Sequence, residues 1–398
     1  MRILLVLLVL FSSACRSSQL ATQLDETLTR MVPFGLSGSV LVADRDGIVL
    51  NKAYGRGLAT DTIYDMGSIT KSFTATAVLM LEDEGKLSVD DTLSKHFDNV
   101  PEDKAAITLR QILSHSAGLV DLTGDDYDRV SREQLVADVM RAPLVSKPGE
   151  EWHYSNAGYS LLAAIVEKVS GKPYETFMKE RLFDPAGMRD TGYRVPARDR
   201  ARVAHTYTPP VDHGSPADRL ERSGGVHWVL LGNGGMLTTT EDLYRWELAL
   251  RGGKIVSPKV YEKLQTPIFK RSDTMHHAAA WTVDTVDGER VMHHGSDAPQ
   301  LGVNGEYRRY PDANVAILFL GNTRVNGWSP RRVVGPAIRK VMRGESRNVP
   351  KTTPSRALAK YAGTYTLADG GTIDVRTNGD HLVAGLTGQS AIDLFTLQ

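Results

Sequence analysis

Residues 37–55 spell SGSVLVADRDGIVLNKAYG, two β-rich runs that meet at Asp46-Gly47. Apolar residues on both sides of an Asp-Gly pair are a strong short-range signal for a β-hairpin. Ahead of this hairpin, apolar residues recur at helical spacing between Leu20 and Met31 and predict an amphipathic helix that ends near Pro33. The chain is therefore expected to enter its first pair of strands from a helix.

Helical patterns dominate the next region, from Ser68 to about Leu250. After Pro267 strands return, in the runs AAWTVDTV, ERVMHHG, NGEYRRY and NVAILFLGN, and a last helix is predicted from Pro330 to Met342. Strands therefore bracket a helical middle. The economical packing is an α/β (α+β) fold, in which terminal helices cover one antiparallel sheet and a helical lobe is inserted. A functional site is expected in the cleft between sheet and lobe.

The C-terminal part has a different character. A polar run over residues 344–355 predicts a linker after a main domain of residues 18–343. Residues 356–398 alternate apolar positions between glycine-containing turn signals, which predicts a small β-rich domain folded as a meander. Because the chain stops soon after Leu394-Phe395, we expect this domain to be incomplete.

The first 15 residues, MRILLVLLVLFSSAC, have the pattern of an export signal. The apolar run Ile3–Phe11 follows one positive charge and is shorter than the about 20 residues that a membrane-spanning helix needs. Cys15 comes directly after small residues and resembles the lipidated cysteine of a bacterial lipobox. We therefore expect an exported protein, periplasmic or on the cell surface, held at the membrane by a lipid on Cys15, with simple secretion as the alternative.

Composition excludes several classes of function. The 398 residues include 47 Lys and Arg against 47 Asp and Glu, so there is no basic surplus for nucleic acid. A single cysteine excludes a disulfide framework within the chain and a cysteine-rich zinc site. Neighbouring residues on a strand point to opposite faces, so neither His276-His277 nor His293-His294 is suited to chelating one ion. We expect a small-molecule substrate and no metal or other cofactor.

The run DMGSITKSF, residues 65–73, carries candidate chemistry. Ser68 enters a long apolar helix, and Lys71 lies one turn later on the same face. A serine hydroxyl needs a base to act as a nucleophile, and a desolvated lysine can have its pKa lowered enough to serve. The start of the helix adds N–H groups where an oxyanion would form. The alternative is a helix-capping serine beside a solvated lysine.

Two further triplets suit the same chemistry. Tyr154 and Asn156 stand in EWHYSN, directly before an apolar helix, and His293 and Gly295 end a predicted strand in VMHHGS. A tyrosine hydroxyl can relay a proton, and a side-chain amide can both position Lys71 and bind a substrate carbonyl. A glycine lets substrate approach the strand edge. Only folding can assemble groups so far apart in the chain.

The motifs S-x-x-K, Y-x-N and H-x-G, in this order, resemble those of the serine β-lactamase and penicillin-binding-protein superfamily, in its class C β-lactamase-like, D-alanyl carboxypeptidase and esterase branch. The segments ITLRQILSHSAGL and GNGGMLTTTEDLYRW also resemble segments of this superfamily. The resemblance covers roughly Phe34 to Asn322 and implies the fold described above. The C-terminal meander is similar to a small β-domain often appended to such hydrolases.

This resemblance implies a role for each candidate residue. Ser68 would form an acyl-enzyme, and Lys71 and Tyr154 would share the general-base and general-acid work. Asn156 would hold the substrate amide or ester. The oxyanion would lie between the N–H groups of Ser68 and Ser296.

The third motif departs from that of true β-lactamases, which usually carry a lysine where His293 stands. A histidine, with a reference pKa of about 6.5, is mostly neutral at pH 7 and attracts a substrate carboxylate less. His294 replaces a small hydroxyl residue, whereas Gly295 and Ser296 complete the predicted substrate-binding set with His293. We therefore expect an exported serine hydrolase for small esters, D-aminoacyl amides or peptides, peptidoglycan-like substrates included. The alternatives are an efficient class C-like β-lactamase and a non-catalytic envelope protein that binds peptidoglycan.

Overall fold

A computed structural model gives the three-dimensional structure of the chain. It describes residues 18–194, 197–325, 329–345, 350–351, 355–366, 372–378, 381–386, 392–394 and 396–397. The predicted leader, with Cys15, lies outside these residues. Within them, none of the helices combines the length and the apolar character needed to cross a membrane.

An eight-stranded sheet, in the order β2-β1-β12-β11-β10-β9-β8-β7, forms the centre of the molecule. All its neighbouring strands are antiparallel. The strands are β1 (Gly38–Asp44), β2 (Gly47–Tyr54), β7 (Phe269–Lys270), β8 (Met275–His277), β9 (Thr282–Val286), β10 (Glu289–Ala298), β11 (Val303–Tyr310) and β12 (Val315–Gly321). The pairing of β1 with β12 joins the two ends of the main region, from Gly38 opposite Gly321 to Ala43 opposite Ala316. The prediction of one antiparallel sheet with strands from both ends is confirmed.

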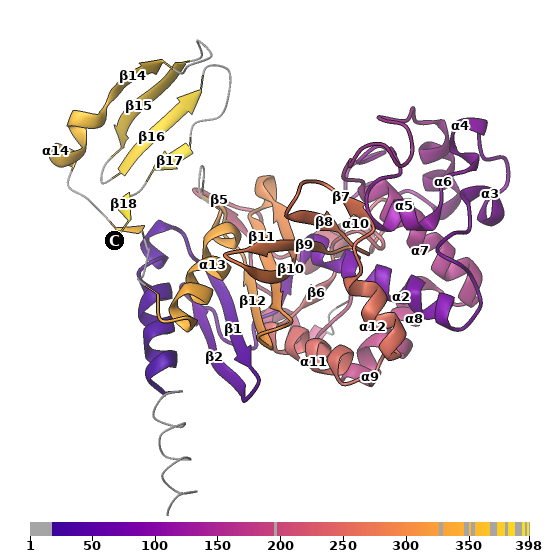
Figure 1. The fold of residues 1–398 in the computed structure, drawn as a ribbon, viewed down its shortest axis with the longest axis horizontal. Helices are drawn as coiled ribbons and strands as arrows, with labels where there is room; N and C mark the ends of the chain where they lie inside the picture. The colour runs from indigo at the N-terminus through magenta and orange to yellow at the C-terminus, as the bar shows by residue number, and fades with distance from the viewer. Residues whose placement is uncertain are drawn as a thin grey trace, which may run out of the picture.

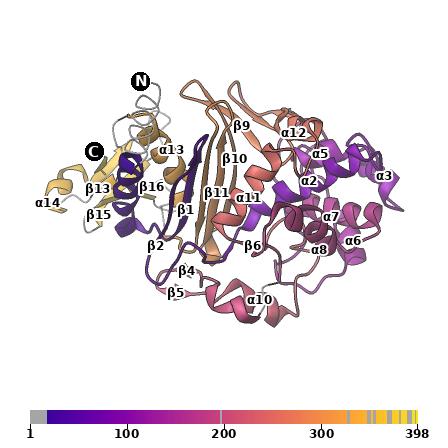
Figure 2. The same ribbon diagram turned by 90° about the horizontal axis from the view of Figure 1, so that it is seen from below.

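Two terminal helices cover one face of this sheet (Figure 2). They are the helix over residues 18–29 and α13 (Pro330–Met342). The bounds of α13 agree with the sequence-based prediction. Leu24, Val40 and Ile338 are fully buried in one hydrophobic cluster that both helices share with the sheet. The apolar residues that recur at helical spacing in the sequence form the helix faces that this contact buries.

The helical lobe lies against the other face, with α11 and α2 on the side nearest the sheet (Figure 2). Its helices are α2 (Thr70–Asp83), α3 (Leu93–His96), α4 (Glu102–Ala105), α5 (Leu109–Leu113), α6 (Arg132–Arg141), α7 (Asn156–Ser170), α8 (Tyr174–Met178), α9 (Asp184–Ala186), α10 (Pro216–Ser223), α11 (Thr240–Arg251) and α12 (Pro258–Gln265). Every residue of α2 from Thr70 to Leu81 is buried, which explains why its apolar residues are not confined to one face.

The segment between β2 and β7 also contains two short strand pairs that the sequence did not predict. They join β3 (Tyr64–Asp65) to β6 (Leu237–Thr238) and β4 (Tyr207–Thr208) to β5 (Val211–Asp212). A two-residue strand is too short to show the alternation that marks a strand in a sequence. The first pair matters for the site because β3 directly precedes the turn that holds Ser68.

The C-terminal residues form a separate four-stranded antiparallel sheet in sequence order, drawn in yellow in Figure 1. Its strands are β14 (Gly363–Thr366), β15 (Thr372–Asn378), β16 (His381–Leu386) and β17 (Ile392–Leu394). Before and after it, β13 (Pro350–Lys351) pairs with β18 (Thr396–Leu397), and α14 (Ser355–Leu358) leads into the sheet. The predicted meander is confirmed, although part of its turns lies outside the described residues.

Candidate active site

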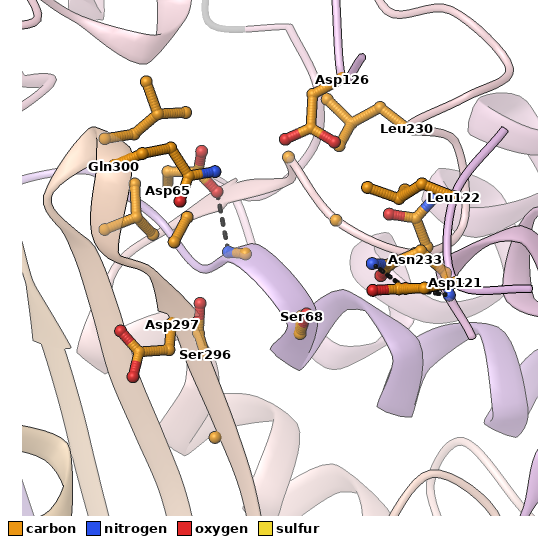
Figure 3. Close-up of a pocket in the computed structure, with 18 of the residues that line it drawn as sticks. Asp65, Ser68, Asp121, Leu122, Asp126, Leu230, Asn233, Ser296, Asp297 and Gln300 are labelled. Atoms are coloured by element: carbon orange, nitrogen blue, oxygen red, sulfur yellow. Dashed lines mark hydrogen bonds between the residues drawn. The ribbon is translucent and has the colours of Figure 1, made fainter. Parts of the chain in front are cut away.

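A cavity of about 390 Å³ lies between β10 and the helical lobe, where the sequence placed a functional cleft. Ser68 stands at its floor, at the start of a helix, with Ser296 and Asp297 on one side and Asp121, Leu122 and Asn233 on the other (Figure 3). The polar and charged lining residues are Asp65, Ser68, Asp121, Asp126, Tyr127, Tyr154, Asn156, Asn233, Ser296, Asp297, Gln300 and Arg331.

The turn that presents Ser68 is a 3₁₀ turn, η2 (Gly67–Ile69), which runs directly into α2. Gly67 has a φ of +46°, and a Cβ built there would lie 2.1 Å from Ser296 Oγ. The carboxylate of Asp65 accepts a hydrogen bond of 2.7 Å from the Gly67 N–H. Glycine is therefore required at this position, both for the backbone conformation and for the close approach of β10 to the serine.

Lys71 is completely buried, and its Nζ has three oxygen neighbours. Ser68 Oγ lies at 3.1 Å, Asn156 Oδ1 at 2.6 Å and the backbone oxygen of Asn233 at 2.6 Å. Burial lowers the pKa of Lys71 to about 7, although the carboxylates of Asp121 and Asp126 act in the opposite direction. Near neutral pH a substantial share of this amine is therefore uncharged.

Tyr154 is the second partner of Ser68, with 2.6 Å between the two hydroxyl oxygens. Burial raises the pKa of Tyr154, so the phenol keeps its proton at neutral pH. His115 holds the segment around it: its backbone oxygen accepts from the His153 N–H at 2.8 Å, and its Nδ1 accepts from the Ser155 N–H at 3.1 Å. Its ring also packs on the Tyr154 ring, with 4.6 Å between the centroids.

Asn156 is oriented by a residue that the sequence did not single out. Its Nδ2 donates to Asp121 Oδ1 at 2.8 Å, which leaves its Oδ1 directed at Lys71. Asp121 lies in the loop after α5 and belongs to none of the three motifs. Only the fold shows that it belongs to the site.

The third motif lies on β10, where side chains alternate between the two faces of the sheet. Met292 packs in the lobe-side cluster and Val291 in the cluster beneath α13, so His294 faces Ser68 and His293 faces away. His294 Nδ1 donates to the Ala280 carbonyl, and burial together with the nearby Lys71 charge lowers the pKa of His294 to about 4.

His293 belongs to a different environment. Its Nδ1 lies 4.0 Å from Glu306 Oε1, and burial and the charge of Arg308 lower the pKa of His293 to about 3. The structure therefore brings Ser68, Lys71, Tyr154, Asn156, Gly295 and Ser296 to the cavity or its wall, but not His293. Moving by one residue along a strand moves a side chain to the other face of the sheet. Because His293 and His294 are adjacent and identical, the sequence could not show which of the two side chains faces the site.

Several residues of the cavity carry no sequence signal. Asp65, Asp126 and Arg331 stand outside all three motifs, whereas Asn233 falls in the GNGG run that accompanies the resemblance. In the described part of the chain, no group of three or more His, Cys, Asp or Glu residues is arranged to hold a metal ion.

Comparison with known proteins supports the resemblance. The β-lactamase family model matches residues 35–334, and a model for a domain of unknown function, DUF3471, matches residues 347–396. The chain is 28% identical to penicillin-binding protein 4* of Bacillus subtilis, over 94% of this chain and 88% of that protein.

Solved structures agree in fold. The octameric penicillin-binding protein homologue of Pyrococcus abyssi superposes with a TM-score of 0.71 and 25% identity, over 95% of this chain and 90% of that one. The D-amino acid amidase of Ochrobactrum anthropi SV3 gives a TM-score of 0.69 at 22% identity, over 82% of this chain and 99% of that one. At that identity the second likeness speaks for the fold alone.

Proposed function

Because the chain belongs to the β-lactamase family and is a serine hydrolase, we propose that Ser68 attacks a carbonyl carbon and forms an acyl-enzyme. The observation that carries this proposal is the contact of Ser68 Oγ with both Lys71 Nζ and the Tyr154 hydroxyl. The bond to the leaving group breaks in this step, and water later hydrolyses the new ester.

Lys71 is the group best suited to take the Ser68 proton. A neutral amine has two N–H groups and one lone pair. The two N–H groups can remain with Asn156 Oδ1 and the Asn233 carbonyl, while the lone pair faces Ser68 Oγ. Tyr154 starts as a protonated phenol and is placed to pass a proton to the leaving group. In this proposal Lys71 acts as the base and Tyr154 as the relay.

The oxyanion is proposed to lie between the N–H groups of Ser68 and Ser296. The close packing of Ser296 against Gly67 supports this, since it holds β10 beside the turn of the nucleophile. The start of α2 adds its positive dipole at the same place.

The proposed substrates are small esters and D-aminoacyl amides or peptides, with β-lactams as the alternative. On β10 the histidine that faces Ser68, His294, is neutral at pH 7, and the strand Glu289–Ala298 contains no lysine. This difference favours esters and amides over efficient β-lactam hydrolysis.

A fluorophosphonate probe tests the nucleophile. The purified protein should be labelled, and Ser68→Ala should abolish the label. Ser72→Ala is a matched control, because Ser72 lies on the same helix and, within the described part of the chain, its hydroxyl bonds to the Ile69 carbonyl alone. Labelling that persists in Ser68→Ala contradicts the assignment.

Export and anchoring are part of the same proposal. Residues 1–15 are proposed to direct export and Cys15 to carry a lipid, ahead of a hydrolase domain of residues 18–343, a linker of residues 344–355 and a small domain of residues 356–398. The two family models, which meet between residues 334 and 347, support this division. Cys15→Ser should move the protein from the membrane fraction to the soluble fraction of a bacterial host. An unchanged membrane fraction would rule out lipidation at Cys15.

A further inference from the structure

A second cavity, of about 990 Å³, lies at the end of the helical lobe away from the central sheet. It is bounded by the segment of residues 97–104, by α6 and by the second half of α7, which lie together in Figures 1 and 2. We call this space the lobe cavity. Among the described residues, none lines both the lobe cavity and the cavity of Ser68. Lys168, on its wall, is roughly 18 Å along α7 from Asn156, so the two cavities are separate.

Apolar side chains line the lobe cavity on three sides. Phe97 comes from the segment before α4, Val136 and Met140 from α6, and Ala164 from α7. Met140 and Ala164 are buried, and Phe97 and Val136 pack against the main hydrophobic cluster of the lobe. The volume and this lining suit a small molecule with an apolar body.

A buried ammonium group lies in the same wall. The side chain of Lys104 is only 3% exposed, and its Nζ donates to Asp103 Oδ2 at 2.8 Å. An ammonium has three N–H groups, and within the described part of the chain this bond is the one that Lys104 Nζ makes. Buried polar groups are normally satisfied, so the unused N–H groups point to a further acceptor that enters from the cavity.

The lobe cavity also has one positive charge without a carboxylate partner. Lys168 lies one turn after Ala164 on α7, and its Nζ donates to the His96 backbone oxygen at 2.6 Å. No carboxylate among the described residues pairs with it. The other lining cations do form ion pairs: Lys104 with Asp103, Arg132 with Glu133 and Glu167, and Arg141 with Asp138. One unpaired cation matches a single negative charge better than the two charges of a phosphate.

We propose that the lobe cavity is a second binding site, which takes a small, free carboxylate with an apolar chain. The carboxylate accepts hydrogen bonds from Lys104 and Lys168, and the chain lies along Val136 and Met140. Charge-assisted hydrogen bonds fix the head group, and burial of the chain adds affinity. This site is independent of the chemistry at Ser68.

Octanoate and octylammonium test the proposal, because they share one chain and differ in charge. Binding is followed by NMR of protein whose methionine methyl groups carry ¹³C. Met140 reports on the lobe cavity, and Met66, directly before Gly67, reports on the cavity of Ser68. Met140→Leu and Met66→Leu assign the two signals. Octanoate should shift the Met140 signal, leave Met66 in place and bind about tenfold or more tighter than octylammonium, as charge-assisted hydrogen bonds predict.

Variants of the two lysines locate the head group. Lys104→Met keeps a long side chain without the charge and should weaken octanoate binding by about tenfold, and Lys168→Gln should weaken it by a smaller factor because Lys168 is exposed. Lys172→Gln is the matched control. Lys172 lies just beyond α7, pairs with Glu180 and does not line the lobe cavity, so its loss should leave octanoate binding unchanged.

Several outcomes would overturn the proposal. They are a Met140 signal that octanoate does not move, a shift of Met66 alone, equal affinities for octanoate and octylammonium, and an octanoate affinity that Lys104→Met leaves unchanged. Should Lys104→Met fail to fold, Lys168→Gln and the comparison of the two probes in the unmodified protein still decide the matter. None of these measurements involves Ser68, so the proposed function is tested separately by its fluorophosphonate label.

Discussion

We expect the protonation state of Lys71 to determine the pH dependence of the reaction. Only its neutral form can accept the Ser68 proton, and burial lowers the pKa of Lys71 to about 7. We therefore expect kcat/KM for p-nitrophenyl acetate to fall about tenfold for each pH unit below about 7 and to level off above it. The raised pKa of Tyr154 predicts no loss at moderately alkaline pH.

A variant of Asn156 provides the check on this profile. Asn156→Asp places a carboxylate beside Lys71 Nζ, which favours the ammonium form and should move the falling limb to higher pH. A limb that stays where it was, or a profile that is flat between about pH 5 and 8, would mean that a different group takes the proton.

The contact of Ser68 with Lys71 and Tyr154 could be predicted at the residue scale because each of these residues stands in a motif with fixed spacing. Ser68 and Lys71 are one helical turn apart, and Tyr154 and Asn156 flank the start of α7. The third motif was different. The choice between His293 and His294 depends on the register of β10, which a sequence shows only when one face is clearly apolar.

At the scale of elements, the loop after α5 holds the second motif in place through His115. This residue has a φ of +59° and binds the backbone on both sides of Tyr154. We expect His115→Ala to lower kcat, by up to about a hundredfold, because Tyr154 loses its position. His115→Asn should recover part of the rate, since asparagine tolerates this backbone conformation and offers an acceptor.

His153→Ala is the matched control for this experiment. Its side chain is partly exposed and pairs with Glu151, away from the cavity, and its backbone N–H remains. Steady-state kinetics and thermal unfolding should be measured for all three variants. A full-rate His115→Ala variant, or an equal loss in His153→Ala, would show that His115 does not position Tyr154.

Elements long enough to show a period were predictable. The hairpin of β1 and β2, the strands from β9 to β12, and α13 were all expected where the structure has them. The pairs β3–β6 and β4–β5 were not, because their strands are two residues long and only tertiary contacts align them. Arg331 shows the same limit of sequence-based prediction. Helix α13 was predicted, but the direction of the Arg331 side chain was not.

On the scale of the whole molecule, the C-terminal sheet shares no strand pairing with the eight-stranded sheet among the described residues. A chain that ends at Glu345 should therefore keep the central sheet, the cavity and fluorophosphonate labelling of Ser68. The labelling rate and thermal unfolding of this shortened protein should be compared with those of the full chain. A folded but unlabelled shortened protein would mean that the C-terminal part completes the site.

The pairing of β1 with β12 also determines how long the first hairpin remains unpaired on one side during protein synthesis. A ribosome adds about 5–20 residues per second, so Gly321 follows Gly38 by roughly a quarter of a minute to a minute. Throughout this interval the first hairpin has no neighbour on one side, and an open strand edge invites pairing with other chains. Aggregation during production should therefore depend on how quickly the last third of the chain is made, and slower translation of that third should reduce the soluble yield.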